Sequence, residues 1–250
     1  MKRKKIFQVL MLAVFFSFLC LGVEWKLDGP FNLKIEDLKV DSNKNPVGLD
    51  HERPVFSWKI ASSDYAVYQK AYQIKVYQAD YVTDQKKLVW DSGKVRSSDT
   101  TNISYQGRDL QSACVYEWQL AIWDEHNYKH EASGSNMFET AYVSEGQPFE
   151  NCEFIAVDDR DLSVQGLPVF VKTFGLEKKT VKKAYYYGAS LGIYDAYING
   201  ERIGGDPCEE LKSGWTNYDK SLLYNTYDIT KMFYGKRQTE YTMAVMLGKG

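Results

Sequence analysis

Histidine and cysteine are scarce in this sequence, and their scarcity narrows the chemistry available to it. Three His and four Cys occur among 250 residues. Cys20 lies in the apolar start of the chain, and the other three thiols, Cys114, Cys152 and Cys208, form no C-x-x-C pair. An odd count without paired spacing argues against a disulfide framework and against a structural zinc site.

The sequence also lacks a large net charge and the common motifs of catalytic and nucleotide-binding sites. Lys and Arg number 31 against 33 Asp and Glu, a formal net charge of -2, which gives no electrostatic footprint for nucleic acid. The sequence contains no G-x-S-x-G, no P-loop and no dinucleotide fingerprint. His126 and His130 form H-x-x-x-H without the glutamate of a zinc protease, and we expect both to be exposed in a loop.

Helical periodicity is rare beyond the first 22 residues. Short alternating runs take its place, at 54–60, 71–79, 87–95, 115–124 and 185–200. Strands at this density predict an all-β chain of tandem β-sandwiches. The aromatic fraction of 15%, including 19 Tyr, fits both pleated strands and wet binding surfaces.

The first 22 residues have the pattern of a secretory signal peptide. Four basic residues at 2–5 precede an apolar run at 6–21, and polar sequence follows. The run is short for a membrane span of about 20 residues. We therefore expect a secreted or periplasmic protein, with a retained membrane anchor as the alternative.

Two β modules are expected after this segment. The first, at 33–143, carries Trp58 in a strand and places Leu110 six residues before Tyr116. A Leu, a short loop and a Tyr that opens a strand predict a tyrosine corner, as in fibronectin type III and immunoglobulin-like sandwiches. We expect at least two of Trp58, Trp118 and Trp123 to be core residues.

A linker at 144–152 separates this module from a second one at 153–250. Asn199-Gly200 between two short apolar runs predicts a two-residue β-hairpin. The sequence stops within a strand-like run at 240–250. Because an unpaired strand edge invites wrong pairing, we expect the second module to be incomplete and the chain to be a fragment.

Three stretches resemble the large inverting α-L-rhamnosidases of glycoside hydrolase family 78. They are "LKVDSNKNPVGLDHERPVFSWKI" (38–60), "AYYYGASLGIYDAYINGERIG" (184–204) and "SGWTNYDKSLLYNTYDIT" (213–230). The resemblance implies a fibronectin type III-like module, then the rhamnosidase N-terminal domain, which is jelly-roll and carbohydrate-binding-like. Ser213 replaces the Pro usual before Gly-Trp-Thr, and an extra Gly precedes Asp206, so the local loops depart from the family.

The resemblance also implies that the catalytic part is missing. An inverting glycosidase needs an acid and a base about 6.5–9.5 Å apart. In the family these carboxylates lie on a helical (α/α)₆ barrel that follows the β domains, and this sequence has no helical repeat to form one. We expect no catalytic residue here. The parent enzyme would hydrolyse terminal α-L-rhamnose from glycans or glycosides, with this chain as scaffold.

Two groups of residues are candidates for binding. Trp215, Asn217 and Tyr218 combine an aromatic ring with amide and hydroxyl groups, as a site for an L-rhamnose-containing carbohydrate requires. The alternative is that Trp215 pins a long loop onto the sandwich. The acidic runs at 157–161 and 206–210 are expected to be solvated loops.

Calcium binding is the second interpretation of the first acidic run, since calcium prefers several oxygen ligands. Its ligands would be Asp158, Asp159 and Asp161. Three rival functions remain open: a free-standing carbohydrate-binding module, a structural adhesion-type tandem, and the N-terminal part of a β-galactosidase-like hydrolase.

Overall fold

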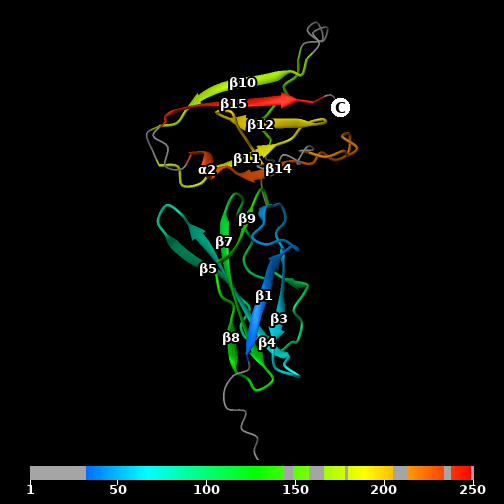
Figure 1. The fold of residues 1–250 in the computed structure, drawn as a ribbon, viewed down its shortest axis with the longest axis vertical. Coiled ribbons are helices and arrows are strands. Elements are labelled where there is room, and N and C mark those ends of the chain that lie inside the picture. Colours follow the sequence, from blue (N-terminus) through cyan, green and yellow to red (C-terminus); the bar gives the residue numbers. More distant parts are fainter. Residues whose placement is uncertain are drawn as a thin grey trace, which may run out of the picture.

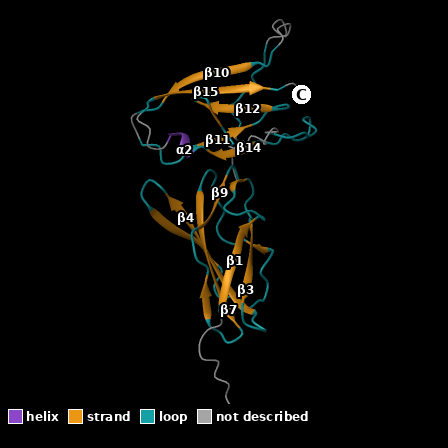
Figure 2. Cartoon of the chain, viewed as in Figure 1, coloured by secondary structure: helices purple, strands orange, loops and turns teal. Residues whose placement is uncertain are grey.

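Strands make up almost all the regular structure of this chain (Figure 2). The computed structural model describes residues 32–143, 149–157, 166–177, 180–204, 213–233 and 238–248. Within these ranges the one helix is α2 (Thr230–Phe233), and none is long and apolar enough to span a membrane. Two β modules follow one another along the long axis of the molecule (Figure 1), so the all-β prediction is confirmed.

The first module consists of two sheets. One has the order β1-β3-β6, and the other β2-β9-β7-β4-β5 with β8 paired to β7. The strands are β1 (Leu33–Val40), β2 (Val47–Leu49), β3 (Val55–Ser62), β4 (Gln69–Asp80), β5 (Gln85–Asp91), β6 (Ile103–Ser104), β7 (Val115–Asp124), β8 (Lys129–Glu131) and β9 (Asn136–Thr140).

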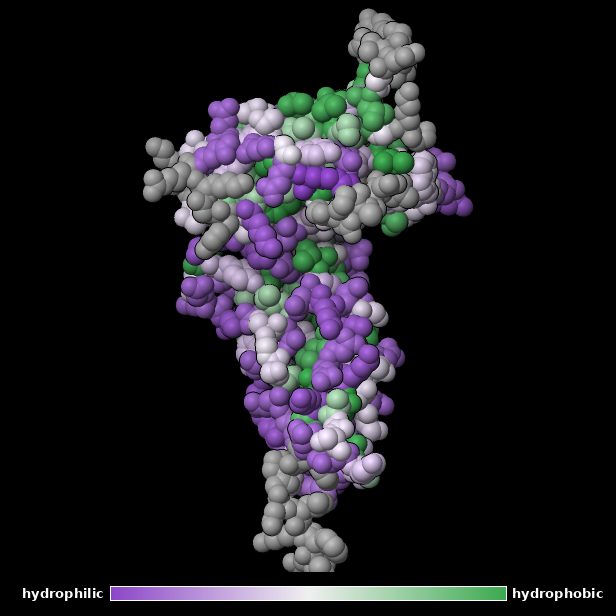
Figure 3. All heavy atoms as spheres, in the orientation of Figure 1, coloured by the Kyte–Doolittle hydropathy of each residue, from purple (hydrophilic) through white to green (hydrophobic). Residues whose placement is uncertain are grey.

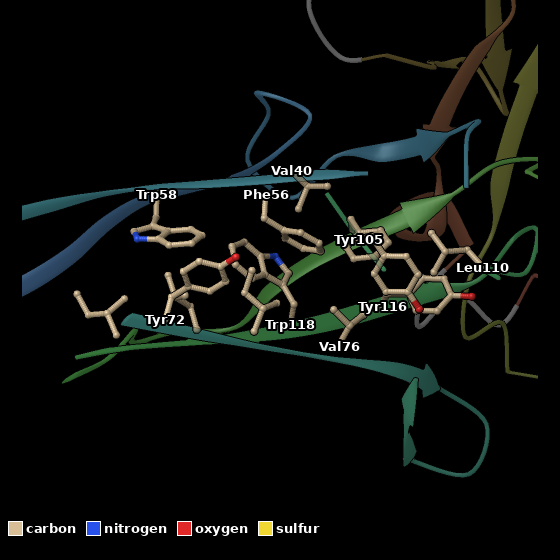
Figure 4. Close-up of a cluster of buried hydrophobic side chains, with 13 residues drawn as sticks. Val40, Phe56, Trp58, Tyr72, Val76, Tyr105, Leu110, Tyr116 and Trp118 are labelled. Atoms are coloured by element: carbon tan, nitrogen blue, oxygen red, sulfur yellow. The ribbon is translucent and has the colours of Figure 1, made fainter. Parts of the chain in front are cut away.

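Alternating residues from both sheets fill the space between them. Figure 4 shows Phe56 and Trp58 of β3 pointing toward Tyr72 of β4 and Trp118 of β7. The ring centres lie 4.8 Å apart for Phe56 and Trp118, and 5.4 Å apart for Trp58 and Tyr72. Such offset aromatic pairs stabilise a core beyond the area they bury. Trp58 and Trp118 are core residues, as expected, whereas Trp123 is half-buried.

The predicted tyrosine corner is present. The backbone N–H of Gln111 donates to the hydroxyl of Tyr116 at 2.7 Å. Leu110 and Tyr116 are each 1% exposed. Burial raises the pKa of Tyr116 to about 12, so the Tyr116 hydroxyl stays neutral over the physiological range.

The second module also has two sheets, with the order β10-β15-β12-β13 in one and β11-β14 in the other. The strands are β10 (Val169–Gly175), β11 (Tyr185–Gly188), β12 (Tyr194–Ile198), β13 (Glu201–Arg202), β14 (Asn225–Asp228) and β15 (Glu240–Leu247). A second apolar cluster forms its core: Tyr194, Ala196, Ile198, Ile203, Ile229, Met232, Phe233 and Tyr241.

The β12–β13 hairpin forms as the sequence predicts. Asn199 and Gly200 have φ of +50° and +83°, and Ile198 faces Glu201 across the turn. Two consecutive positive φ values are what a type I′ turn requires, which is why Asn-Gly is favoured there. The turn is also anchored to the sheet, because the Asn199 side chain accepts from the Thr242 N–H at 2.8 Å.

The last described strand differs from the prediction. The alternating run at 240–250 was expected to end on an unpaired sheet edge, but β15 pairs with β10 on one side and β12 on the other. The premise of an unpaired final strand is therefore wrong. The order of strands in this sheet depends on pairs more than 40 residues apart, which an alternating pattern alone does not specify.

The β11–β14 sheet lies between the core of the second module and the first module (Figure 1). Tyr186 and Tyr227 are cross-strand partners that pack against the second core. Because side chains alternate across a strand, the residues on either side of them point the other way. Those residues contact the first module.

Three kinds of contact hold this junction. Lys183 binds Glu139 of the first module at 2.8 Å, and the hydroxyl of Tyr185 donates to the same carboxylate. The rings of Tyr142 and Tyr187 meet edge to face, 5.4 Å apart. Backbone and side chain also approach closely, because a Cβ on Gly48 would lie 2.6 Å from the Cβ of Thr226. The two modules therefore share charged, aromatic and steric contacts.

The tyrosine corner predicts that removing the hydroxyl oxygen of Tyr116 destabilises the protein. We expect Tyr116→Phe to lower the free energy of unfolding by about 1–3 kcal/mol, because it leaves the Gln111 N–H without its acceptor. Urea denaturation measures this value. Tyr128→Phe is the control, since Tyr128 is 41% exposed. Equal unfolding free energies for both variants would contradict the assigned role of the Tyr116 hydroxyl.

The junction predicts a contrast between two glycines of similar backbone geometry. Gly48 has φ +86° and its Cβ position is occupied by Thr226, whereas Gly134 has φ +90° and open space around it. Both Ala substitutions strain the backbone by about 1 kcal/mol, and the clash at residue 48 adds about 1–3 kcal/mol.

We expect Gly48→Ala, and not Gly134→Ala, to loosen the junction as well as destabilise the protein. Thermal unfolding followed by calorimetry measures both effects. A single shared transition in wild type and Gly134→Ala should broaden or split in Gly48→Ala. If both variants lose the same stability with the same transition shape, Gly48 does not serve the junction.

Candidate functional site

The candidate sugar-binding residues lie in one turn that leads into β14. Trp215 follows Gly214, whose φ is +78°. The exposed fraction of Trp215 is 58%. The side-chain oxygen of Asn217 accepts from the Asp219 N–H at 3.2 Å, and the Asn217 carbonyl accepts from the Ser221 N–H at 2.9 Å. The turn is thus held by its own hydrogen bonds, and one of them occupies the side-chain oxygen of Asn217.

Tyr218 is oriented differently from Trp215. It is half-buried, and its hydroxyl is enclosed without a hydrogen-bond partner. A buried hydroxyl without a partner is unfavourable, so this oxygen is a place for a polar ligand atom or a water molecule. The structure brings the three residues into one turn but presents only Trp215 and Asn217 to the outside.

Two exposed leucines lie near the segment that carries Trp215. Leu191 is 60% exposed and belongs to a loop joined to this turn by the bond from the Ser190 N–H to the Ser213 hydroxyl, 2.9 Å. A Cβ on Gly214 would lie 3.7 Å from a methyl of Leu223, which is 52% exposed. The alternation of residues 213–230 does not identify Leu223 as a surface residue. Leu191 gave no signal in the sequence as a surface residue.

The candidate calcium ligands Asp158, Asp159 and Asp161 lie outside the described residues, as does the acidic run at 206–210. Across the ranges that the structure does describe, no three His, Cys, Asp or Glu side chains come together as metal ligands. Calcium binding by residues 158–161 therefore stays a prediction.

His130 is not the exposed loop residue that the sequence suggested. It lies in β8, its side chain is 10% exposed, and its Nε2 is 2.9 Å from the carboxylate of Asp124. Asp124 is fully buried and accepts from the N–H groups of His126 and Tyr128 at 3.0 and 2.9 Å. This pair closes the β7–β8 turn, which accounts for its burial without a catalytic role.

Two carboxylates converge at the junction, and Asp228 does not fit the acid of a glycosidase. Glu139 and Asp228 both bind the Lys183 ammonium at 2.8 Å. A general acid needs a raised pKa. Burial raises the pKa of Asp228, but the bonds from Lys183 and Thr230 outweigh it and hold the pKa below its usual value. Asp228 therefore stays ionised near neutral pH.

The other members of this cluster keep their protons. Burial lowers the pKa of Lys183, but its bonds to Asp228 and Glu139 exceed that effect and raise the pKa overall. Burial and the bond to Glu139 raise the pKa of Tyr185. A protonated ammonium and a neutral phenol hold both carboxylates, so the cluster is built to fix the modules rather than to transfer protons.

Family models match both modules. Residues 35–144 match the Rha78A-like, N-terminal immunoglobulin domain, and residues 179–250 match the alpha-L-rhamnosidase N-terminal domain. Among curated relatives, an alpha-L-rhamnosidase of Formosa agariphila is 28% identical over 99% of this chain and 27% of its own length. One of Alteromonas sp. is 30% identical over 82% of this chain and 22% of its own length.

Solved structures agree with these matches. The alpha-L-rhamnosidase from Dictyoglumus thermophilum superposes with a TM-score of 0.70 at 32% identity, over 87% of this chain and 25% of that one. The enzyme from Aspergillus terreus, at 23% identity and a TM-score of 0.66, shows the same fold. The chain spans about a quarter of the length of the relatives it matches. Residues 35–144 and 179–250 of this chain thus match two N-terminal domains of α-L-rhamnosidases.

Proposed function

We propose that this chain is the non-catalytic N-terminal scaffold of an α-L-rhamnosidase that removes terminal α-L-rhamnose from glycans or glycosides. The junction carries the proposal. Lys183 and Tyr185 of one module and Glu139 of the other fix two sandwiches to each other, as a spacer between substrate and catalytic domain requires. The pattern of residues 1–22 supports secretion or periplasmic export of the enzyme.

An exposed apolar face on the second module supports contact with a further domain. Figure 3 shows hydrophobic residues gathered around β10, whereas the visible face of the first module is mainly hydrophilic. Val169 and Val171 of β10 are 52% and 63% exposed. Apolar sheet faces of this kind are common at domain interfaces. The catalytic domain of the parent is the partner that this face fits.

The second candidate function is sugar binding by the surface around Trp215. The exposed indole ring of Trp215, on a segment near the exposed Leu191 and Leu223, can stack on the apolar face of a sugar, and Asn217 in the same turn offers an amide. This arrangement suits L-rhamnose, whose methyl group adds apolar area. It is compatible with the scaffold role, because the same chain would hold substrate near the enzyme.

The scaffold proposal predicts an inactive chain. We expect no hydrolysis of 4-nitrophenyl α-L-rhamnoside by this protein, because Glu139 and Asp228 are both bound by Lys183. The full-length Formosa agariphila relative, assayed in parallel, is the positive control. Turnover by this chain that disappears in Asp228→Asn would place an active site at the junction and overturn the proposal.

The sugar-binding candidate predicts a specific loss of affinity. We expect Trp215→Ala to weaken L-rhamnose binding about tenfold, or about 1.4 kcal/mol, measured by calorimetry with and without calcium. Tyr65→Ala is the matched control, because Tyr65 is 97% exposed and lies in the other module. Unchanged affinity in Trp215→Ala would leave Trp215 with the role of pinning its loop.

A further inference from the structure

A groove of about 750 Å³ lies between the two modules. One wall is the β4–β5 hairpin, residues 78–82 and 85–87, together with residues 113–115 at the start of β7. The other wall is the segment that enters β11, with Thr180, Lys182, Lys183 and Tyr185. Figure 1 shows the hairpin beside the second module. The volume falls in the range of ligand sites, about 300–1,000 Å³.

The second wall of this groove is rigid before any ligand arrives. Lys183 is held by Glu139 and Asp228, and Tyr185 is held by Glu139. The Lys183 ammonium also lies 5.4 Å from the ring centre of Tyr81 on the opposite wall, within cation–π range. A wall fixed in this way loses little conformational entropy on binding, which favours affinity.

Two lysines in the groove have no carboxylate partner. Lys86 is neutralised by Glu117 at 2.6 Å, and Lys183 by the junction carboxylates. In the part of the chain that the structure describes, no Asp or Glu pairs with Lys87 on the first wall or with Lys182 on the second. The groove therefore offers one unpaired ammonium from each module.

Asp80 is the one acidic residue among the described residues that line the groove, and it is already engaged. Its carboxylate accepts from the Val82 N–H and the Thr83 hydroxyl, both at 2.8 Å. These bonds lower the pKa of Asp80 and tie the charge to its own turn. Beside it, Val82 is 79% exposed and the Tyr81 ring lines the groove. The lining thus combines apolar surface with free cationic donors.

We propose that this groove binds a glycan chain that carries carboxylate groups, such as a uronic acid oligomer. Lys87 and Lys182 would pair with sugar carboxylates from opposite walls, and Tyr81 and Val82 would pack against the C–H face of a sugar ring. The site is separate from the Trp215 surface. It deepens the proposed function, since it rests on a parent enzyme that acts on glycans and names an acidic part of that substrate.

The test compares one acidic ligand with its neutral form. Trigalacturonate and its fully methyl-esterified counterpart are titrated into the protein by calorimetry at low and moderate salt. We expect the acid to bind at least about fivefold more tightly than the ester, since two exposed charge pairs each strengthen binding modestly. Raising the salt should remove most of this difference, because exposed charges are screened.

The variant Lys87→Met/Lys182→Met should lower affinity for trigalacturonate about fivefold and leave affinity for the ester unchanged. Lys34→Met/Lys70→Met is the control, since it removes the same charge from exposed lysines that do not line the groove. Thermal unfolding checks that both double variants fold as wild type does, which their exposure favours.

Three results would overturn the proposal: no binding of trigalacturonate, equal binding of acid and ester, or an equal loss in both double variants. None of these results would contradict the proposed scaffold role, which the rhamnoside hydrolysis assay tests separately. Conversely, acid binding in a chain that hydrolyses rhamnoside would uphold the groove and refute the scaffold.

Discussion

The structure depends on one partly buried ion cluster between its two modules. Lys183 is bound by Glu139 from the first module and Asp228 from the second, and Tyr185 adds a hydroxyl to Glu139, which is 6% exposed. Removing one partner of such a cluster leaves a buried charge without compensation, which is far more costly than exposing a surface pair. The cluster therefore makes the relative position of the modules part of the fold.

Strand alternation explains how so small a sheet serves two purposes. In β11 and β14, Tyr186 and Tyr227 point into the second core, while Tyr185 and Asp228 point toward the first module. The same two strands thus close a sandwich and build the junction. A polar outer face would normally be solvated. Here it is covered by the first module, which is why aromatic and charged residues alternate with core residues along so short a stretch.

The sequence predicts what local patterns determine. The Leu110 to Tyr116 spacing predicted the tyrosine corner and Asn199-Gly200 predicted the hairpin, because each depends on residues close in the chain. The junction escaped prediction because Glu139 and Lys183 are 44 residues apart and neither has a motif. The place of β15 inside its sheet and the exposure of Leu223 escaped for the same reason, since both depend on distant pairing. Alternation of apolar and polar residues predicts which side chains share a face of a strand, but it does not predict which strand lies next to it.

The junction also decides what chemistry the described modules can perform. A glycosidase separates the pKa values of its two carboxylates so that one can donate a proton. Here the two that converge share one ammonium, which lowers the pKa of Asp228 and opposes its use as a proton donor. The contribution left to these modules is geometric: rigid walls that hold a groove open between two sandwiches, and a solvent-exposed indole on a self-bonded turn. The groove requires fixed relative positions of the modules, which the contacts that join them supply.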